Sequence, residues 1–207
     1  MEYLQSLFDT SPASVTLLAT MIVVSLVGLF VAPWVVETNL LRPYWVARQN
    51  RYWTLVTCTF IHADIAHLFF NAFTFYAFAF QLERAIGTGS FVQLYVFAML
   101  VSSIGTWLQH RNEPGYASLG ASGAILGVLF AYILYFPAAK LFILPIPVPI
   151  PAWLFALAYV AYSLYASRYS KGRTNHDAHL AGAAAGIVFV LLTDTATVAR
   201  AMRSFLG

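Results

Sequence analysis

The sequence predicts an all-α polytopic membrane protein, and two features of its composition support this prediction. Hydrophobic residues fill 60% of the 207 positions, whereas Asp, Glu, Lys and Arg together fill only 9%. A typical soluble domain carries about 25% charged residues, so this chain has too few charges to cover a water-facing surface. The mean hydropathy of +0.74 agrees. These values exclude a soluble globular protein, a disordered tail and a nucleic-acid-binding protein.

Long runs without charged residues predict six membrane-spanning helices. A spanning helix needs about 20 mostly apolar residues, and such helices fit the chain at about 14–34, 64–83, 90–109, 119–136, 151–169 and 178–195. The first run lacks a preceding basic segment and is too long for the core of a typical signal peptide, which favours a retained helix. No internal repeat or soluble segment is visible, so we expect one membrane domain over residues 1–207.

Residues 35–62 predict a loop that lies at the membrane–water interface. This segment is too polar to span a bilayer and too aromatic to be a plain linker. Aromatic side chains with a polar edge prefer the headgroup region. The residues that support this interpretation are Trp45, Tyr52, Trp53, Arg42, Arg48 and Arg51.

A second unusual connection lies between the fourth and fifth predicted helices. Proline occupies every other position here, at Pro145, Pro147, Pro149 and Pro151. Each proline removes a backbone donor and fixes φ, so no helix can run through this spacing. The pattern predicts an extended, polyproline-like link.

Four polar side chains interrupt the apolar helices: His67 and Asn71 in the second, Ser122 in the fourth and His179 in the sixth. Such residues are costly in a membrane and need a partner or a function. The second, fourth and sixth helices cross in the same direction, and each polar residue lies near the start of its helix. With a rise of about 1.5 Å per residue, all of them fall near one membrane face. We therefore expect them to form one site.

Glycine spacing indicates how two of these helices approach each other. Segments 123–127 and 182–186 both begin and end with glycine. Small residues at this spacing allow two helix backbones to come close together in a membrane. If these two faces pack against each other, Ser122 and His179 come within hydrogen-bonding distance.

A serine beside a neutral histidine is the minimum requirement for nucleophilic acyl transfer. The imidazole accepts the hydroxyl proton during attack and returns it to the leaving group. The negative oxygen of the tetrahedral intermediate needs donors, and the backbone amide of Ser122 at a helix N-terminus, with His67 and Asn71, can supply them. Asp177 precedes His179 by two residues and should point elsewhere, so the sequence predicts a Ser–His dyad.

Four short motifs follow one another along the chain: His67-Leu-Phe-Phe-Asn71, Glu83-Arg84 followed by Gly87, Gly120-Ala121-Ser122-Gly123, and Ala178-His179-Leu180-Ala181-Gly182. In this order they are specific, whereas a serine between two glycines would be a weak signal alone. On these motifs the chain resembles the rhomboid intramembrane serine proteases over nearly its whole length.

The resemblance implies a role for each matching residue. Ser122 corresponds to the nucleophile and His179 to the base, while His67 and Asn71 correspond to the oxyanion-stabilising side chains. Gly120 and His62 correspond to supporting positions. The implied activity is endopeptidase cleavage of transmembrane protein substrates inside a water-filled cavity of a six-helix bundle in the lipid bilayer, without a metal, another cofactor or nucleic acid.

The resemblance also implies a lateral entrance for substrates along the fifth helix. Trp153 and Phe155 correspond to gate residues on this helix, and Phe70 is a plausible residue facing them. Two positions depart from the family pattern. Thr54 follows Trp53 where the family often has arginine, whose role is either absent or supplied by Arg51. Leu126 lies four residues after Ser122, where the family commonly has an aromatic residue, so the sequence leaves open how the His179 ring is held.

Membrane topology gives conflicting signals. We expect a multi-pass protein of a prokaryotic cell membrane with both termini in the cytoplasm, as the resemblance implies. The positive-inside rule points to the reverse orientation, because the loops expected outside carry seven of the 11 Lys and Arg residues and the other side carries four. The seven are Arg42, Arg48, Arg51, Arg111, Arg168, Lys171 and Arg173.

Two other functions remain as alternatives. The first is a non-catalytic rhomboid-like protein that binds and holds transmembrane helices. The second is a metal-dependent enzyme or ion carrier that uses His62, His67, His176, His179 and Asp177. The spacing of His176 and His179 suits chelation of one metal. The sequence contains no HExxH motif and no acidic residue in the middle of a predicted helix.

Overall fold

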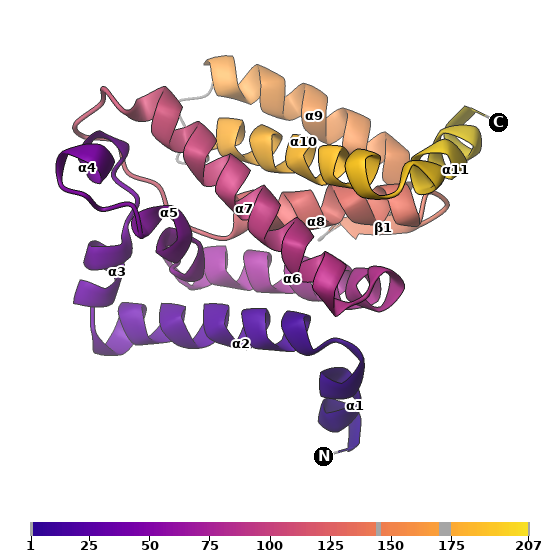
Figure 1. Cartoon of the computed structure of the whole chain (residues 1–207), viewed down its shortest axis with the longest axis horizontal. Helices are drawn as coiled ribbons and strands as arrows, with labels where there is room; N and C mark the ends of the chain where they lie inside the picture. The colour runs from indigo at the N-terminus through magenta and orange to yellow at the C-terminus, as the bar shows by residue number, and fades with distance from the viewer. Residues whose placement is uncertain (1, 144–145, 170–174, 207) are drawn as a thin grey trace.

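The structure is a computed structural model, and it describes residues 2–143, 146–169 and 175–206. Helices dominate it, joined by one short hairpin (Figure 1). The elements in chain order are α1 (Glu2–Thr10), α2 (Pro12–Leu26), the π-helix η1 (Val27–Val31), α3 (Trp34–Asn39), α4 (Pro43–Arg48), α5 (Thr54–Thr57), the 3-10 helix η2 (Cys58–Phe60), α6 (Ile65–Ile86), α7 (Thr88–His110), α8 (Ser122–Tyr135), β1 (Lys140–Ile143), β2 (Ile146–Pro151), α9 (Ala152–Tyr169), α10 (His176–Thr193) and α11 (Thr195–Leu206).

Six apolar helices form the body of the molecule. Among the described residues, four helices are long and apolar enough to cross a membrane: Pro12–Val31, Ile65–Ile86, Thr88–His110 and His176–Thr193. Two shorter apolar helices, Ser122–Tyr135 and Ala152–Ser167, accompany them. The protein is therefore an all-α multi-pass membrane protein, which confirms the predicted fold class.

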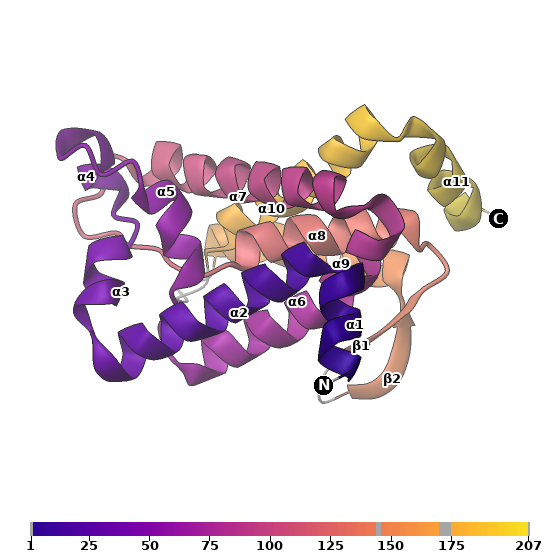
Figure 2. The ribbon, with the colours of Figure 1, turned by 60° about the horizontal axis from the view of Figure 1, so that its bottom comes forward.

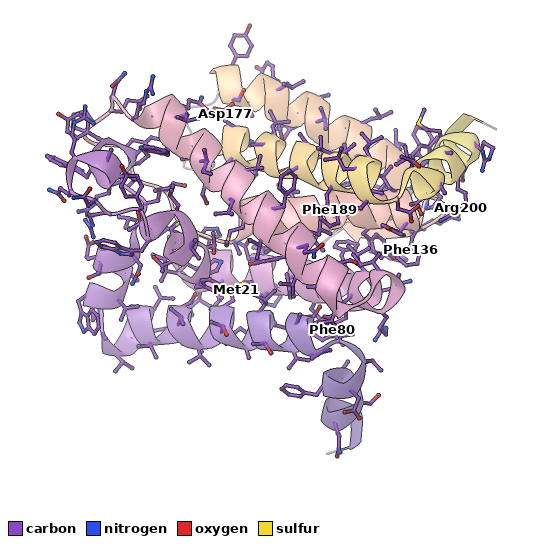
Figure 3. All side chains as sticks on the ribbon, viewed as in Figure 1. Met21, Phe80, Phe136, Asp177, Phe189 and Arg200 are labelled. Atoms are coloured by element: carbon purple, nitrogen blue, oxygen red, sulfur yellow. The ribbon has the colours of Figure 1, made fainter. Side chains whose placement is uncertain are left out.

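The helix bundle has two ends, and different segments of the chain lie at each end. Figures 1 and 2 show α6, α8 and α10 beginning at the end where α3, α4 and α5 lie, which we call the loop end. The N-terminus, the hairpin and α11 lie at the opposite end, the terminus end. In Figure 3, Asp177 lies at the loop end, while Phe136 and Arg200 lie at the terminus end. The expected site residues therefore start from the same end of the bundle.

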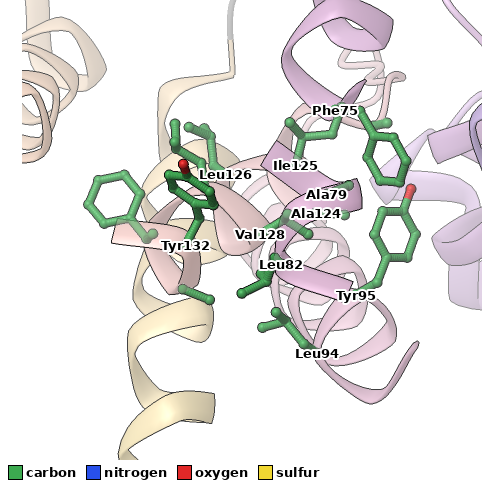
Figure 4. Close-up of a cluster of buried hydrophobic side chains, with 14 of the residues drawn as sticks. Phe75, Ala79, Leu82, Leu94, Tyr95, Ala124, Ile125, Leu126, Val128 and Tyr132 are labelled. Atoms are coloured by element: carbon green, nitrogen blue, oxygen red, sulfur yellow. The ribbon is translucent and has the colours of Figure 1, made fainter. Parts of the chain in front are cut away.

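The central helix of the bundle is α8. Every residue from Gly123 to Ile133 is buried, as expected for a helix that is apolar on all sides. Figure 4 shows side chains of α8 packed with those of α6 and α7, including Val128, Leu82 and Leu94. This surrounding contact fixes the position of α8 in the bundle.

The fourth apolar helix begins at Ser122, slightly later than the expected start at about residue 119. The preceding residues are held in an extended path by other segments. Leu41 and Ser118 form an antiparallel bridge, and the Gly120 amide donates to the carbonyl of Cys58 over 2.9 Å. Gly120 has a φ of +105°, outside the helical region. As a result, Ser122 is the first residue of α8.

The proline-rich connection forms an antiparallel hairpin, and the expected polyproline-like link was wrong in this respect. Leu141 pairs with Ile150, and Lys140 pairs with Pro151. Alternate residues of a strand present their N–H groups to the same edge, so the alternating prolines of β2 all lack donors on one edge and leave the other edge free to pair. Pro145 lies outside the described residues.

The interfacial loop predicted at 35–62 folds into the short helices α3, α4, α5 and η2. The Arg51 guanidinium donates to the carbonyl of Thr38 over 2.7 Å and lies 5.9 Å from the ring of Trp53. Arg51 therefore braces this loop, which is one of the two possibilities that the sequence left open for a chain with Thr54 after Trp53.

We expect substitution of Gly182 by alanine to destabilise the protein. A β-carbon at Gly182 would overlap the carbonyl oxygen of Gly123, so α8 and α10 would have to separate. Overpacking of this kind costs about 1–3 kcal/mol or more. Thermal unfolding in detergent should show a lower midpoint for Gly182→Ala than for Gly105→Ala, whose β-carbon would lie 3.7 Å from that of Ala181. Equal midpoints would show that the glycine contact does not constrain the two helices.

Candidate active site

Ser122 and His179 meet at the loop end of the bundle. Ser122 begins α8, and His179 lies in the first turn of α10. The Oγ atom of Ser122 and the Nε2 atom of His179 are 2.7 Å apart, which is hydrogen-bonding distance. Both side chains are half-buried. The structure thus brings together the hydroxyl and the imidazole that the sequence predicted to meet.

Close packing of glycines makes this contact possible. A β-carbon on Gly182 would overlap the Gly123 carbonyl, and a β-carbon on Gly186 would overlap the Gly127 carbonyl. The glycines of α10 therefore pack directly against the backbone of α8 at Gly123 and Gly127, a close approach of the kind that the spacing predicts. Because Ser122 and His179 lie beside the first of these contacts, their short side chains can reach each other.

His67 and Asn71 lie on α6 and line the same cavity as Ser122 and His179. Asp64 caps the start of α6, since its carboxylate accepts a bond of 2.7 Å from the His67 amide. The Asn71 side-chain amide donates to the His67 carbonyl over 2.9 Å. A carboxamide has two N–H donors, so one remains for a ligand in the cavity.

Gly120 and His62 both lie against the ring of His67. A β-carbon at Gly120 would lie 2.7 Å from Cε1 of His67, which leaves no room for a side chain there. The fully buried ring of His62 contacts that of His67 edge to face, with centroids 4.9 Å apart. Together they restrict where the His67 imidazole can lie.

A serine on α2 fixes the tautomer of His62, and the sequence analysis did not identify it. Ser25 donates its hydroxyl proton to the Phe60 carbonyl over 3.0 Å, and its oxygen lies 2.8 Å from Nδ1 of His62. Because the serine proton is engaged, Nδ1 of His62 must be the donor to Ser25. Burial, with the neighbouring His67, lowers the pKa of His62 to about 3, so this ring is neutral at pH 7.

The cavity in front of these residues has a volume of about 870 Å³. It is bounded by the α3 segment, the loop before α8 and the starts of α6, α8 and α10. Its lining includes hydroxyl and amide side chains, among them Thr59, Ser102, Ser103, Ser118 and Asn175. A cavity of this size and polarity can hold water.

Cys58 also lines the cavity, but burial raises the pKa of its thiol to about 12. The reactive form of cysteine is the thiolate, which is scarce at neutral pH when the pKa is this high. The Cys58 thiol is therefore a poor nucleophile at neutral pH, whereas the Ser122 hydroxyl has an adjacent base.

The expected gate residues Phe70, Trp153 and Phe155 lie on α6 and α9. The side chain of Phe70 is 57% exposed and that of Trp153 is 40% exposed, on α6 and α9 respectively. Phe70 contacts the ring of Phe69, whereas Phe155 contacts the ring of Tyr159. No ring contact joins Phe70 to either α9 residue in the described parts of the chain.

Tyr159 is a second contact that the sequence analysis missed. Its hydroxyl on α9 lies 2.8 Å from Nδ1 of His179. The sequence left open how the His179 ring is held, because Leu126 occupies the position of the family aromatic. Tyrosines are frequent in this chain, and only the orientation of α9 distinguishes Tyr159 from the others.

The side chain of Asp177 bonds to a residue other than His179, as the sequence predicts. Its carboxylate accepts a bond of 2.7 Å from the side chain of Gln109 on α7. Within the described residues, no three His, Cys, Asp or Glu side chains are grouped to hold a metal ion.

The known proteins that this chain resembles in sequence are rhomboid proteins. The rhomboid domain family matches residues 49–194. Rhomboid protein 1, mitochondrial, of Saccharomyces cerevisiae is 30% identical over 139 residues, which cover 66% of this chain and 40% of that protein. RHOMBOID-like protein 12, mitochondrial, of Arabidopsis thaliana is 28% identical over 158 residues, 68% of this chain and 46% of that protein.

A bacterial protein shares a shorter segment. Rhomboid protease GluP of Bacillus subtilis is 38% identical over 85 residues, which cover 41% of this chain and 16% of that protein. The matched segments thus span less than half the length of each of these three relatives.

The buried, neutral His62 predicts that acidification destabilises the fold. Its pKa is about 3 in the folded protein and about 6.5 in the unfolded chain, so between these values only the unfolded chain binds the proton. Stability should fall as the pH decreases through this window, by at most about 1.4 kcal/mol per pH unit. The pH dependence of thermal unfolding should therefore be shallower in His62→Gln than in the wild type. His110→Gln, at the end of α7, is the control, and identical slopes for wild type and His62→Gln would contradict the assignment.

Proposed function

The chain belongs to the rhomboid family, and from this premise we propose that it is an intramembrane serine endopeptidase that cleaves transmembrane segments. The observation that carries the proposal is the 2.7 Å contact between Ser122 Oγ and His179 Nε2 at the edge of a polar cavity. In this proposal Ser122 is the nucleophile and His179 the general base.

The proposed reaction follows the logic of acyl transfer. Ser122 Oγ attacks the carbonyl carbon of the scissile peptide bond while its proton passes to Nε2 of His179. The carbonyl oxygen takes the electron pair and becomes an oxyanion. Collapse of the tetrahedral intermediate breaks the C–N bond, and the imidazolium returns the proton to the leaving amine. Water then hydrolyses the acyl-enzyme by the same steps.

In this proposal three donors stabilise the oxyanion. The Ser122 amide is at the N-terminus of α8, where it has no acceptor within the helix and the helix dipole favours negative charge. His67 and the free N–H of Asn71 reach the same cavity. Donors arranged before the reaction are effective because they need no reorganisation when the charge develops.

The length of α8 supports a reaction below the membrane surface. Its 14 residues give a helix of about 21 Å, whereas the hydrocarbon core of a bilayer is about 30 Å thick. If α8 reaches the membrane surface at the terminus end, Ser122 lies about 9 Å below the other surface. A polar cavity that opens toward the loop end would bring water to this depth.

We propose that the substrate enters between α6 and α9. Phe70 and Trp153 expose large aromatic side chains on these two helices, and Phe155 packs closer to the dyad, against Tyr159. An apolar entrance suits a transmembrane helix, which has to unwind locally before its backbone carbonyl can reach Ser122. The substrates are therefore membrane proteins, as the family resemblance implies.

The protein is a multi-pass membrane protein, and we propose that both ends of the chain lie on the same side of the membrane. The N-terminus and α11 lie at the terminus end (Figure 1), away from the cavity. We propose that this is the cytoplasmic side. The comparisons give no support to the expectation of a prokaryotic cell membrane, because two of the relatives described above are named as mitochondrial. Lys171 and Arg173, which contribute to the opposing charge count, lie outside the described residues.

A non-catalytic helix-binding protein is the competing function. Such a protein does not need a reactive serine, whereas a protease does. Covalent labelling by a fluorophosphonate, with mass-spectrometric mapping of the modified residue, distinguishes the two. A protease is modified at Ser122, and a pure binding protein is not modified there.

We expect Ser122→Ala and His179→Ala each to abolish cleavage of a single-span substrate reconstituted in liposomes. The first removes the nucleophile and the second removes the base, so each single change should cost most of the catalytic rate. Ser90→Ala, which removes an exposed hydroxyl on α7, should cleave at the wild-type rate. Continued cleavage by Ser122→Ala would refute the proposed mechanism.

Loss of one oxyanion donor should have a smaller effect. For Asn71→Ala we expect kcat to fall by about 10²- to 10³-fold, equivalent to about 2.7–4 kcal/mol. A similar decrease is expected for His67→Ala. Gln93→Ala, which truncates an exposed amide on α7, is the matched control. If the two α6 variants behave like the control, His67 and Asn71 do not stabilise the transition state.

A further inference from the structure

The imidazole of His179 is held between two hydroxyl groups from different helices. Its Nε2 atom lies 2.7 Å from Oγ of Ser122 on α8. Its Nδ1 atom lies 2.8 Å from the hydroxyl oxygen of Tyr159 on α9. Both ring nitrogens therefore have a partner, and the orientation of the ring is set from both sides.

The phenol is itself fixed by packing. Its ring contacts Phe130 on α8, with centroids 6.2 Å apart, and Phe155 on α9, with centroids 5.7 Å apart. Ser163, which is fully buried, lies one turn further along α9 and places its hydroxyl beside the phenol of Tyr159. Tyr159 thus reaches His179 from a rigid, largely apolar environment.

These two contacts constrain the direction of the hydrogen bonds. A neutral imidazole carries one ring proton, so one nitrogen donates and the other accepts. If Ser122 donates to Nε2, then Nδ1 must carry the proton and donate to the phenol oxygen. In the opposite arrangement Nε2 carries the proton and cannot accept one from Ser122. The direction of the Tyr159 bond therefore decides whether His179 can act as a base.

No carboxylate occupies this position in the described part of the chain. Asp177, the acidic residue nearest to His179 in sequence, bonds to Gln109 on α7. The nearby His176 contacts the His179 ring only edge to face, with centroids 6.0 Å apart. The hydroxyl of Tyr159 is thus the group bonded to Nδ1.

We infer that Tyr159 is the positioning residue of His179, holding the tautomer in which Nδ1 is protonated and Nε2 is free to accept the Ser122 proton. This inference rests on the proposed function of Ser122 and His179. During attack the Ser122 proton moves to Nε2, and the Nδ1 proton stays in its bond to the phenol oxygen. Tyr159 neither gains nor loses a proton, and its oxygen lone pair stabilises the imidazolium.

The test compares Tyr159→Phe with Tyr165→Phe. Phenylalanine keeps the ring at position 159 and removes only the hydroxyl, which leaves Nδ1 without a partner. Tyr165 is an exposed tyrosine on the same helix, so its loss of a hydroxyl is the matched control. We expect Tyr159→Phe to lower the rate of Ser122 phosphonylation by fluorophosphonate, and kcat for a transmembrane substrate, by about 10- to 100-fold. KM and the thermal unfolding midpoint should stay close to those of Tyr165→Phe.

A spectroscopic readout separates positioning from general packing. Nitrogen-15 NMR of protein with labelled histidine reports which ring nitrogen carries the proton. In the wild type His179 should be protonated at Nδ1, and Tyr159→Phe should give a mixture of both tautomers. A proton on Nε2 in the resting wild-type protein would overturn the inference without any variant.

The possible failures can be told apart. If the wild type is phosphonylated at Ser122 and Tyr159→Phe matches Tyr165→Phe in rate and tautomer, only the role of Tyr159 is refuted. If the wild type neither cleaves substrate nor reacts at Ser122, the proposed function is refuted. In that case the NMR comparison still shows whether Tyr159 sets the tautomer of His179.

Discussion

Direct contact between the backbones of α8 and α10 determines where the polar side chains of the site can meet. Gly182 and Gly186 of α10 lie directly against the carbonyl groups of residues 123 and 127 of α8, with no side chain between them. The α8 glycines in turn leave room for Ser102 and Ala98 of α7. In a membrane, where apolar surfaces gain little from contact with each other, such close packing is a principal source of helix association. It also sets the distance between the first turns of both helices, and this distance lets a short serine side chain reach an imidazole.

The other elements orient the side chains that surround Ser122 and His179. The loop before α8 is tied to the α3–α5 region through Leu41 and Cys58, so the helix starts at Ser122 and presents its free amide to the cavity. The α6 helix supplies His67 and Asn71, and Ser25 of α2 bonds to His62, whose ring lies against that of His67. Finally, α9 contributes Tyr159 to the far side of the imidazole. Nearly every apolar helix thus contributes to one cluster of polar side chains.

The sequence predicts much of this arrangement because membrane segments obey simple rules. Uncharged runs locate the helices, and alternation of direction places His67, Ser122 and His179 at the same end. Glycine spacing then predicts which two helices touch. Tyr159 and Ser25 could not be predicted in this way, because tyrosine and serine are unremarkable in membrane helices and their role depends on how α9 and α2 are rotated. The hairpin of β1 and β2 was missed because proline spacing excludes a helix without deciding whether one edge can still pair.

A crystal structure of the protein after reaction with a fluorophosphonate in lipid would show directly whether Ser122 is the nucleophile. We predict phosphorus bonded to Oγ of Ser122, with the phosphoryl oxygen directed at the Ser122 amide and the side chain of Asn71. We also predict that the Gly123 carbonyl remains in contact with Gly182. An unmodified Ser122, or α8 and α10 separated by side chains so that His179 lies away from the serine, would contradict these predictions.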